Sequence, residues 1–196
     1  MKRVGQQTIE FTTPPCIEGH GAVGGKKEAD GPLGQDFDQT FQDTTLATES
    51  WEKAEAQLQK EAVGLALQKA GVQAGDVDFI LAGDLLNQCI SSTFGLLDYQ
   101  IPFLGQYGAC STMAQTLFLA SVLVDCGAAR RAAAVTSSHF CSAERQFRTP
   151  LEYGAQRTPT AQWTATASGC ALVGQKGKVR VLRGLAGKIV DLGVKD

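Results

Sequence analysis

The sequence lacks three features: an excess of charge of one sign, a long hydrophobic run and a closely spaced pair of cysteines. Its 196 residues include 18 Lys and Arg against 20 Asp and Glu, a formal net charge of −2. A near-neutral chain has no global field that attracts nucleic acid, so we expect no nucleic-acid partner. The most apolar stretch, residues 113–124, contains Gln115 and is well short of the roughly 20 residues that span a bilayer. We therefore expect no transmembrane helix.

The cysteines and the N-terminus argue against further classes of protein. The six cysteines are at least 15 positions apart, so the sequence has no Cys-x-x-Cys pair for a zinc ribbon or a redox motif. We expect free thiols in a reducing cytosol and no metal site. No apolar core follows the basic pair Lys2 and Arg3, so secretion is not expected.

The composition supports a packed core, because hydrophobic residues make up 43% of the chain and charged residues 19%. Residues 1–47 are rich in Gly and Pro, and we predict an early strand near residues 8–11 followed by a long loop. Within this region, Gly19-x-Gly21-x-x-Gly24 matches the dinucleotide-binding fingerprint as a string. We set it aside, because it follows Pro14-Pro15 rather than a clean strand and opens no convincing helix.

Residues 48–196 alternate between helical and strand-like patterns. Apolar residues from Trp51 onward recur on one helical face, with Ser50 or Thr48 as the N-cap and Gly71 at the end. The other predicted elements are strands at 78–82, 132–136, 163–167 with 170–173, and 178–182, and helices at 87–97, 111–129 and 142–148. Strands that alternate with helices predict a layered α/β fold with an at least partly parallel sheet.

Two of these elements carry further expectations. The helix at 111–129 has Asp125 as its only charge, so we expect it to be buried on nearly every side. Residues 101–104 form a short extended run, and Pro102 argues against a central place for it in the sheet.

Cys110 stands directly before that apolar helix. Unpaired N–H groups and the positive end of the helix dipole favour a thiolate at such a position. Small neighbours, Gly108, Ala109 and Ser111, suit a tight strand-to-helix elbow. The alternative is a small buried hydrophobe at a helix start, which is how free cysteine usually behaves. A nucleophilic thiol also needs a base, and His20 and His139 are the only histidines.

Polar residues also follow two predicted strands. Asp84 ends one of them, and Ser137, Ser138 and His139 end another. Ligands of open α/β sheets gather at such ends, so these residues and Cys110 are candidates for one pocket. Helix capping by Asp84 and Ser137, and a structural role for His139, are the alternatives.

Arg145 and Arg148 lie in a polar helix close behind these residues. They are candidates for an anionic ligand, with solvated helix charges as the alternative.

Five separated blocks resemble the stage V sporulation protein AD family of spore-forming Firmicutes. They are residues 30–34 (DGPLG), 83–88 (GDLLNQ), 108–112 (GACST), 136–139 (TSSH) and 143–148 (AERQFR). The resemblance runs over essentially the whole chain, and a more distant one links it to thiolases and the ketoacyl-carrier-protein synthase III group. It implies a thiolase-like α/β fold with layered αβαβα architecture, of which residues 1–196 correspond to the N-terminal half.

The resemblance also implies a function. The expected ligand is dipicolinic acid (pyridine-2,6-dicarboxylic acid), free or as its calcium chelate, taken up into the developing spore without another cofactor. Expected partners are the other proteins of the SpoVA operon, at a cytoplasmic, peripheral location on the spore inner membrane, with indirect membrane contact. The apolar face left by an absent second half predicts self-association, with a homodimer as one form.

Carried over by position, Cys110 falls at the thiolase nucleophile, and Asp84 and Ser137 match the family's ligand pocket, with Ser138 and His139 adjacent. Asp84 would either donate a hydrogen bond while protonated or help to hold calcium. In the related enzymes the His and Asn partners of the cysteine lie in the second half, so we expect a binding protein and not an enzyme.

Two alternatives stay open. One is an acyltransferase that uses Cys110 as its nucleophile, and the other is a scaffold subunit with a vestigial pocket.

Overall fold

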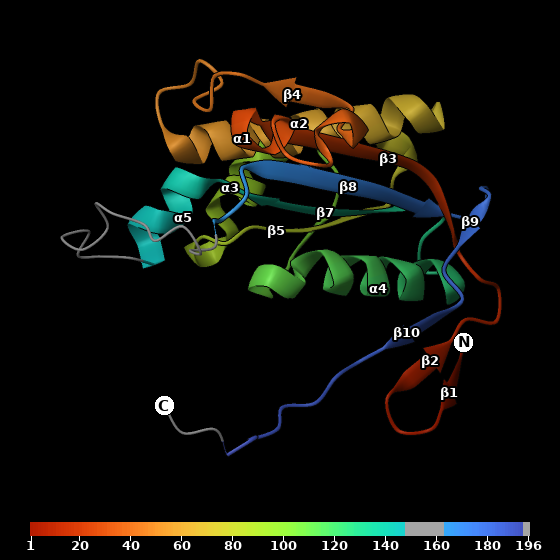
Figure 1. The fold of residues 1–196 in the computed structure, drawn as a ribbon. Helices are drawn as coiled ribbons and strands as arrows, with labels where there is room; N and C mark the ends of the chain where they lie inside the picture. Colours follow the sequence, from red (N-terminus) through yellow and green to blue (C-terminus); the bar gives the residue numbers. More distant parts are fainter. Residues whose placement is uncertain (148–162, 194–196) are drawn as a thin grey trace.

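The computed structural model describes residues 1–147 and 163–193. A seven-stranded mixed sheet lies between helices, with α2 (Trp51–Ala70) over one face and α4 (Thr112–Asp125) over the other (Figure 1). A small second sheet lies beside the C-terminal end of α4. It joins, all antiparallel, β1 (Lys2–Val4), β2 (Thr8–Glu10) and β10 (Arg183–Leu185).

The main sheet confirms the partly parallel arrangement. Its order is β4 (Gln39–Phe41), β3 (Cys16–Gly25), β8 (Ala167–Gly174), β7 (Ala132–Ser138), β5 (Phe79–Gly83) and β6 (Phe103–Gly105), and β9 (Val179–Arg180) pairs with the start of β3. Strands β7, β5 and β6 run parallel, whereas β8 is antiparallel to both β7 and β3. Since β6 is an edge strand, Pro102 just before it costs no central ladder bond, as predicted.

The long loop predicted up to residue 47 is wrong, because residues 16–25 form the longest strand of the sheet. Gly19 and Gly21 explain both the strand and the error. A Cβ at Gly19 would collide with the carbonyl oxygen of Ala66, and one at Gly21 with that of Ala62. The glycines thus let β3 lie directly on the backbone of α2, and they hold no phosphate-binding turn. After β3 come α1 (Lys26–Ala29), a 3-10 turn (Gly34–Asp36) and β4.

Helix α2 has the predicted boundaries. Ser50 is its N-cap and accepts a hydrogen bond from Lys53 N (3.2 Å), and Gly71 ends it with a left-handed φ of 67°.

The helix predicted at 87–97 is shorter in the structure. Helix α3 spans Ile90–Gly95, because Gln88 and Cys89 have positive φ values. Three short 3-10 turns follow α2, α3 and β6, namely Ala74–Asp76, Leu97–Tyr99 and Ala109–Ser111.

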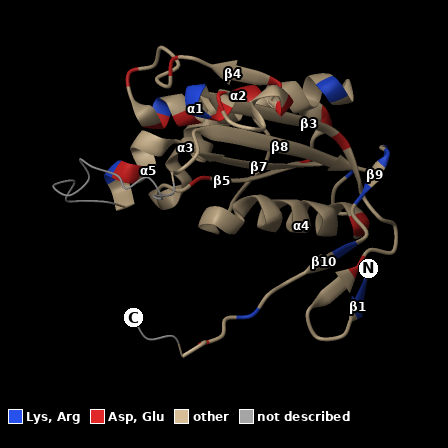
Figure 2. Cartoon of the chain, in the orientation of Figure 1, with Lys and Arg blue, Asp and Glu red and all other residues tan. Residues whose placement is uncertain are grey.

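The predicted burial of the helix at 111–129 on nearly every side is wrong. Its buried residues form one stripe toward the sheet: Thr112, Thr116, Ala120, Ser121 and Val124. In the described part of the chain the sheet covers one side of α4 and Phe118 packs beside Phe11 and Gly184, so the rest of the helix surface stays half-buried or exposed. Figure 2 shows this helix without charge except near its C-terminal end.

The core consists of two clusters, one on each face of the sheet. Val135 and Leu172 pack with α2, whereas Ala134 and Val173 pack with α4. This alternation follows from the two-residue period of a strand and fixes which side chains can meet each helix. Among the described residues, no helix is long and apolar enough to cross a membrane.

Candidate ligand-binding site

A cavity of about 540 Å³ lies at the C-terminal end of β7, beside the start of α4. Its lining comes from four places along the chain: Leu85; Ala109, Cys110 and Met113; Thr136, Ser137 and Ser138; and Trp163, Thr164, Ala165, Ala167, Ser168 and Gly169. None of these residues is charged. The cavity thus offers hydroxyl groups and apolar surface, the usual lining of a small-molecule site, within the usual volume range of about 300–1,000 Å³.

Cys110 lies where the sequence predicted, in the turn before α4. Its side chain is exposed, and the preceding Ala109 has a left-handed φ of 46°. The Ser111 hydroxyl donates to Gly108 O (2.7 Å) and makes no capping bond to the helix. The first N–H groups of α4 therefore receive no cap from this side chain and lie beside the cavity.

Neighbouring residues of β7 face opposite sides of the sheet. Ala134 packs with α4 and Val135 with α2, so Thr136 and Ser138 face α4 and Ser137 faces α2. The Ser137 hydroxyl donates to Glu55 Oε1 (2.8 Å) and accepts from Gln59 Nε2 (2.7 Å). Ser137 thus borders the cavity, but its hydroxyl is bound on the other side of the sheet. The Ser138 hydroxyl donates to Ala165 O (2.6 Å).

Asp84 does not line the cavity. It is buried, and its Oδ1 accepts from Leu86 N (2.9 Å) while Oδ2 accepts from Ser92 N (2.8 Å) and Ser92 Oγ (2.6 Å). Three donors from its own chain thus already bond to the two oxygens of this carboxyl group. This geometry supports neither role expected for Asp84, as a protonated donor to the ligand or as a calcium ligand.

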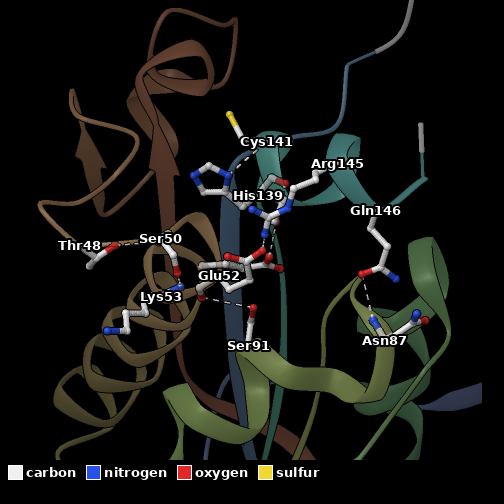
Figure 3. A network of polar contacts seen from close by, with 12 residues as sticks. Thr48, Ser50, Glu52, Lys53, Asn87, Ser91, His139, Cys141, Arg145 and Gln146 are labelled. Carbon is white, nitrogen blue, oxygen red and sulfur yellow. Dashed lines mark hydrogen bonds and ion pairs between the residues drawn. The ribbon is translucent and has the colours of Figure 1, made fainter. Parts of the chain in front are cut away.

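His139 is also buried and does not line the cavity. Its Nε2 lies 2.7 Å from Thr44 O, and its Nδ1 accepts from Cys141 N (3.2 Å; Figure 3 shows the contact with Cys141). These partners assign the neutral Nε2–H tautomer, and burial lowers the pKa of the ring. His20 lies 3.3 Å from Lys69 Nζ, and neither histidine lines the cavity with Cys110.

Arg145 is bound on the surface rather than at the cavity. It pairs with Glu52 and lies over the ring of Trp51, 5.4 Å from its centroid (Figure 3 shows the ion pair). Arg148, the other predicted arginine, lies outside the described residues.

Sequence reasoning missed several residues of the cavity. Thr136 and Thr164 line it, and their hydroxyls make no hydrogen bond within residues 1–147 and 163–193. A Cβ at Gly169 would meet nothing within 4 Å, so this strand glycine leaves the wall open. A glycine inside a strand was the one available signal, since such a residue often marks a close approach of a ligand.

Trp163 forms the outer wall of the cavity. Its ring stacks on Phe140 with the centroids 4.7 Å apart, and Lys27 Nζ lies 3.3 Å from its centroid. Within the described residues, no group of three His, Cys, Asp or Glu side chains is placed to hold a metal ion.

Comparison with known proteins supports the resemblance found in the sequence. A profile described as stage V sporulation protein AD (SpoVAD) matches residues 5–196. Stage V sporulation protein AD of Bacillus subtilis (strain 168) is 46% identical over 197 residues, which cover 100% of this chain and 58% of that protein. The chain thus spans less than two thirds of the length of this curated relative.

Solved structures with a similar fold include a 3-oxoacyl-[acyl-carrier-protein] synthase III and OleA. The 3-oxoacyl-[acyl-carrier-protein] synthase III of Aquifex aeolicus VF5 is 14% identical, with a TM-score of 0.56 over 84% of this chain and 55% of that chain. OleA H285N of Xanthomonas campestris with cerulenin is 10% identical, with a TM-score of 0.56 over 85% and 58%. These likenesses confirm the thiolase-like α/β fold and, at such low identity, no more than the fold. With its profile match over residues 5–196, the chain belongs to the stage V sporulation protein AD family.

Proposed function

We propose that this chain binds dipicolinic acid, free or as its calcium chelate, in the cavity at the start of α4, as a non-enzymatic step in uptake into the developing spore. The observation that carries the proposal is the uncharged, hydroxyl-rich cavity beside Cys110 in a member of a sporulation family.

The ligand's chemistry fits this lining. Dipicolinate is a flat aromatic dianion, and an acidic wall would repel it. Thr136 and Thr164 offer hydroxyl donors, and the start of α4 offers N–H groups and the positive end of its dipole. Met113 and Trp163 provide apolar surface for the ring. Because the lining has no carboxylate, calcium would enter as part of the chelate, held by the ligand's own oxygens.

The cellular setting is part of the same proposal. The protein would work with the other SpoVA operon proteins at the cytoplasmic side of the spore inner membrane, and its membrane contact would run through them. Self-association as a homodimer is proposed on the half-exposed apolar face of α4.

Calorimetric titration of dipicolinic acid, with and without calcium, tests the binding site. We expect saturable binding by the 196-residue chain and, for Cys110→Ala, an affinity lower by about tenfold, which corresponds to ~1.4 kcal/mol. Cys126→Ala is the matched control, since Cys126 is an exposed thiol at the other end of α4. Circular dichroism checks that each chain is folded. A folded chain that binds neither form of the ligand would contradict the proposal and favour the scaffold role.

A second candidate is acyl transfer through Cys110. The observation that favours it is the exposed thiol at a helix start in a fold shared with 3-oxoacyl-[acyl-carrier-protein] synthase III. Against it, His139 has both ring nitrogens bound and His20 lies beside Lys69, so neither described histidine is placed as the base. Incubation of a version that includes the second half with a radiolabelled acyl-coenzyme A decides the matter: label on Cys110 that then passes to a second substrate would establish the enzyme, and an unlabelled thiol would exclude it.

A further inference from the structure

Two buried carboxyl groups lie on the α2 side of the sheet, behind the wall of the cavity. Glu55 comes from α2, and Asp84 follows β5. Gln59 lies between them and donates from Nε2 to Ser92 Oγ (2.8 Å) and to Ser137 Oγ (2.7 Å). Each serine hydroxyl donates in turn to a carboxyl group, Ser92 to Asp84 and Ser137 to Glu55. A continuous hydrogen-bonded chain therefore links the two carboxyl groups.

The number of donors differs between the two ends of this chain. Asp84 accepts three hydrogen bonds, from Leu86 N, Ser92 N and Ser92 Oγ. At the other end, Ser142 Oγ lies 3.0 Å from Glu55 Oε2 and also 3.0 Å from His139 O. A serine hydroxyl has one hydrogen, and a carbonyl and an ionised carboxylate are both acceptors. A proton on Glu55 Oε2 gives each contact its own hydrogen: Glu55 donates to Ser142, and Ser142 donates to His139 O, which also accepts from Ala143 N (3.0 Å).

The surroundings of Glu55 favour this proton. Burial, the largest cause, and the nearby charge of Asp84 raise the pKa of Glu55 to about 7, although its hydrogen bonds with Ser137, Ser142 and Ser91 act in the opposite sense. The elements packed on α2 supply no cation to this side chain. Strands β7 and β8 and helix α3 carry no Lys or Arg, α5 (Phe140–Phe147) carries Glu144 and Arg145, which pairs with Glu52, and the His20 of β3 lies against Lys69. His139 is neutral, as its partners require.

The contacts of Glu55 lead to the cavity wall. Ser142 lies in α5, and Ser137 lies at the end of β7. At the start of the same helix, Phe140 N donates to Thr166 Oγ1 (3.0 Å) and the Phe140 ring stacks on Trp163. The segment that carries Trp163 is also held by Ser138, which donates to Ala165 O. Fixing α5 to α2 thus fixes one side of the cavity.

We propose that Glu55 is a positioning residue that holds a proton and, through Ser142 and Ser137, locks α5 and the end of β7 in the arrangement that forms the cavity. Loss of the proton leaves two acceptors facing one hydroxyl and a second negative charge near Asp84. The start of α5, and with it the Trp163 wall, then loosens. The proposal rests on the geometry of the cavity wall and not on which ligand fills the cavity.

Two measurements on the ligand-free 196-residue chain test this. Carbon NMR of ¹³C-carboxyl-labelled glutamate should show one resonance that titrates near neutral pH and is absent from Glu55→Gln. Hydrogen exchange, corrected for the intrinsic effect of pH, should show protection of the α5 amides about tenfold or more weaker at pH 8.5 than at pH 5.5, since a single ionisation can shift an opening equilibrium by that factor per pH unit. In Glu55→Gln the protection should be the same at both pH values, because the amide can donate to Ser142 as the protonated acid does.

Glu61→Gln is the control, because Glu61 lies on the same helix and its carboxylate accepts from Gln57 (2.6 Å) away from α5. It should keep the pH response. If Glu55→Gln does not fold, Ser142→Ala removes the link between Glu55 and α5, so the protection of the α5 amides should lose its dependence on pH while the Glu55 resonance still titrates near neutral pH. A Glu55 carboxyl that titrates near 4.5, or α5 protection that does not depend on pH in the unmutated chain, would overturn the proposal. Neither readout uses dipicolinate, so a failure of the proposed function is distinguishable from a failure here.

Discussion

At the scale of single residues, the alternation of side chains along β7 separates neighbours that a sequence motif groups together. Thr136 and Ser138 face α4 and the cavity, whereas Ser137 faces α2 and the buried network. A shift of one residue along a strand moves a side chain to the other face of the sheet. We therefore expect substitutions at Thr136 to act on the ligand directly, and substitutions at Ser137 to act through the network.

Gly169 gives the sharpest test of the cavity at this scale. Because a Cβ at this position would meet open space, Gly169→Leu should place its side chain in the cavity and leave the sheet intact. We expect dipicolinate affinity to fall by at least about tenfold in calorimetry, since the leucine occupies volume the ligand needs.

Gly75→Leu controls for the substitution itself. Gly75 also has nothing within 4 Å of its added Cβ, and it lies in a 3-10 turn that contributes nothing to the cavity. Its affinity should match that of the unmutated chain. Undiminished binding by Gly169→Leu would place the ligand elsewhere.

At the scale of elements, the close packing of β3 on α2 determines the position of the longest strand. Gly21→Ala would push a methyl group against the carbonyl oxygen of Ala62, which is helix backbone and cannot turn aside. We expect a loss of about 1–3 kcal/mol in the free energy of unfolding, the usual cost of overpacking. Urea unfolding measures it, with Gly75→Ala as the matched control. An equal stability of the two variants would refute direct packing of strand on helix.

At the scale of the whole molecule, two sets of carboxyl groups give stability opposite dependences on pH. The pKa of Asp38 is lowered by its bond to Lys69, and that of Asp43 by its bond to Thr45, so their contribution is present above about pH 4 and is lost as the pH falls through the lowered values. The pKa of Glu55 is raised, chiefly by burial, to about 7. Its folded form binds a proton that the unfolded chain releases near 4.5, so stability declines as the pH rises between these values.

The expected size of the Glu55 effect follows from linkage. The difference between the pKa of Glu55 in the folded protein, about 7, and its value of 4.5 in the unfolded chain corresponds to about 3 kcal/mol of unfolding free energy lost between pH 4.5 and pH 8. Burial lowers the pKa of His139, so its effect on the free energy of unfolding below pH 6.5 is opposite in sign to that of Glu55. The quantity to measure is therefore the difference in unfolding free energy between the unmutated chain and Glu55→Gln, because the contribution of His139 is common to both. Urea unfolding at pH 5, 6.5 and 8 should show that, as the pH rises, the free energy of unfolding of Glu55→Gln increases relative to that of the unmutated chain. A constant difference would mean that Glu55 titrates alike in both states.

Prediction from the sequence succeeded where local signals agree. The helix from Trp51 has a periodic apolar face, a serine cap and a terminal glycine, and the structure places its ends at those residues. It failed at Cys16–Gly25, because the glycines there contribute no apolar pattern and their role depends on the backbone of a helix some 40 residues later. The candidate site was predicted in part: Cys110, Ser137 and Ser138 border the cavity, whereas Asp84 and His139 are bound elsewhere in the protein.

The sequence by itself determined the class of fold and the place of Cys110 at the start of an apolar helix, since these depend on periodicity and on residues close together in the chain. It also determined the family, through five motif blocks that resemble it. The tertiary structure alone decided which polar side chains meet. Whether a serine faces a cavity or a buried carboxyl group depends on strand register and on helices distant in sequence. The proton assigned to Glu55 is of the same kind, because Glu55 and Ser142 are 87 positions apart in the chain and only folding brings their side-chain oxygens to 3.0 Å.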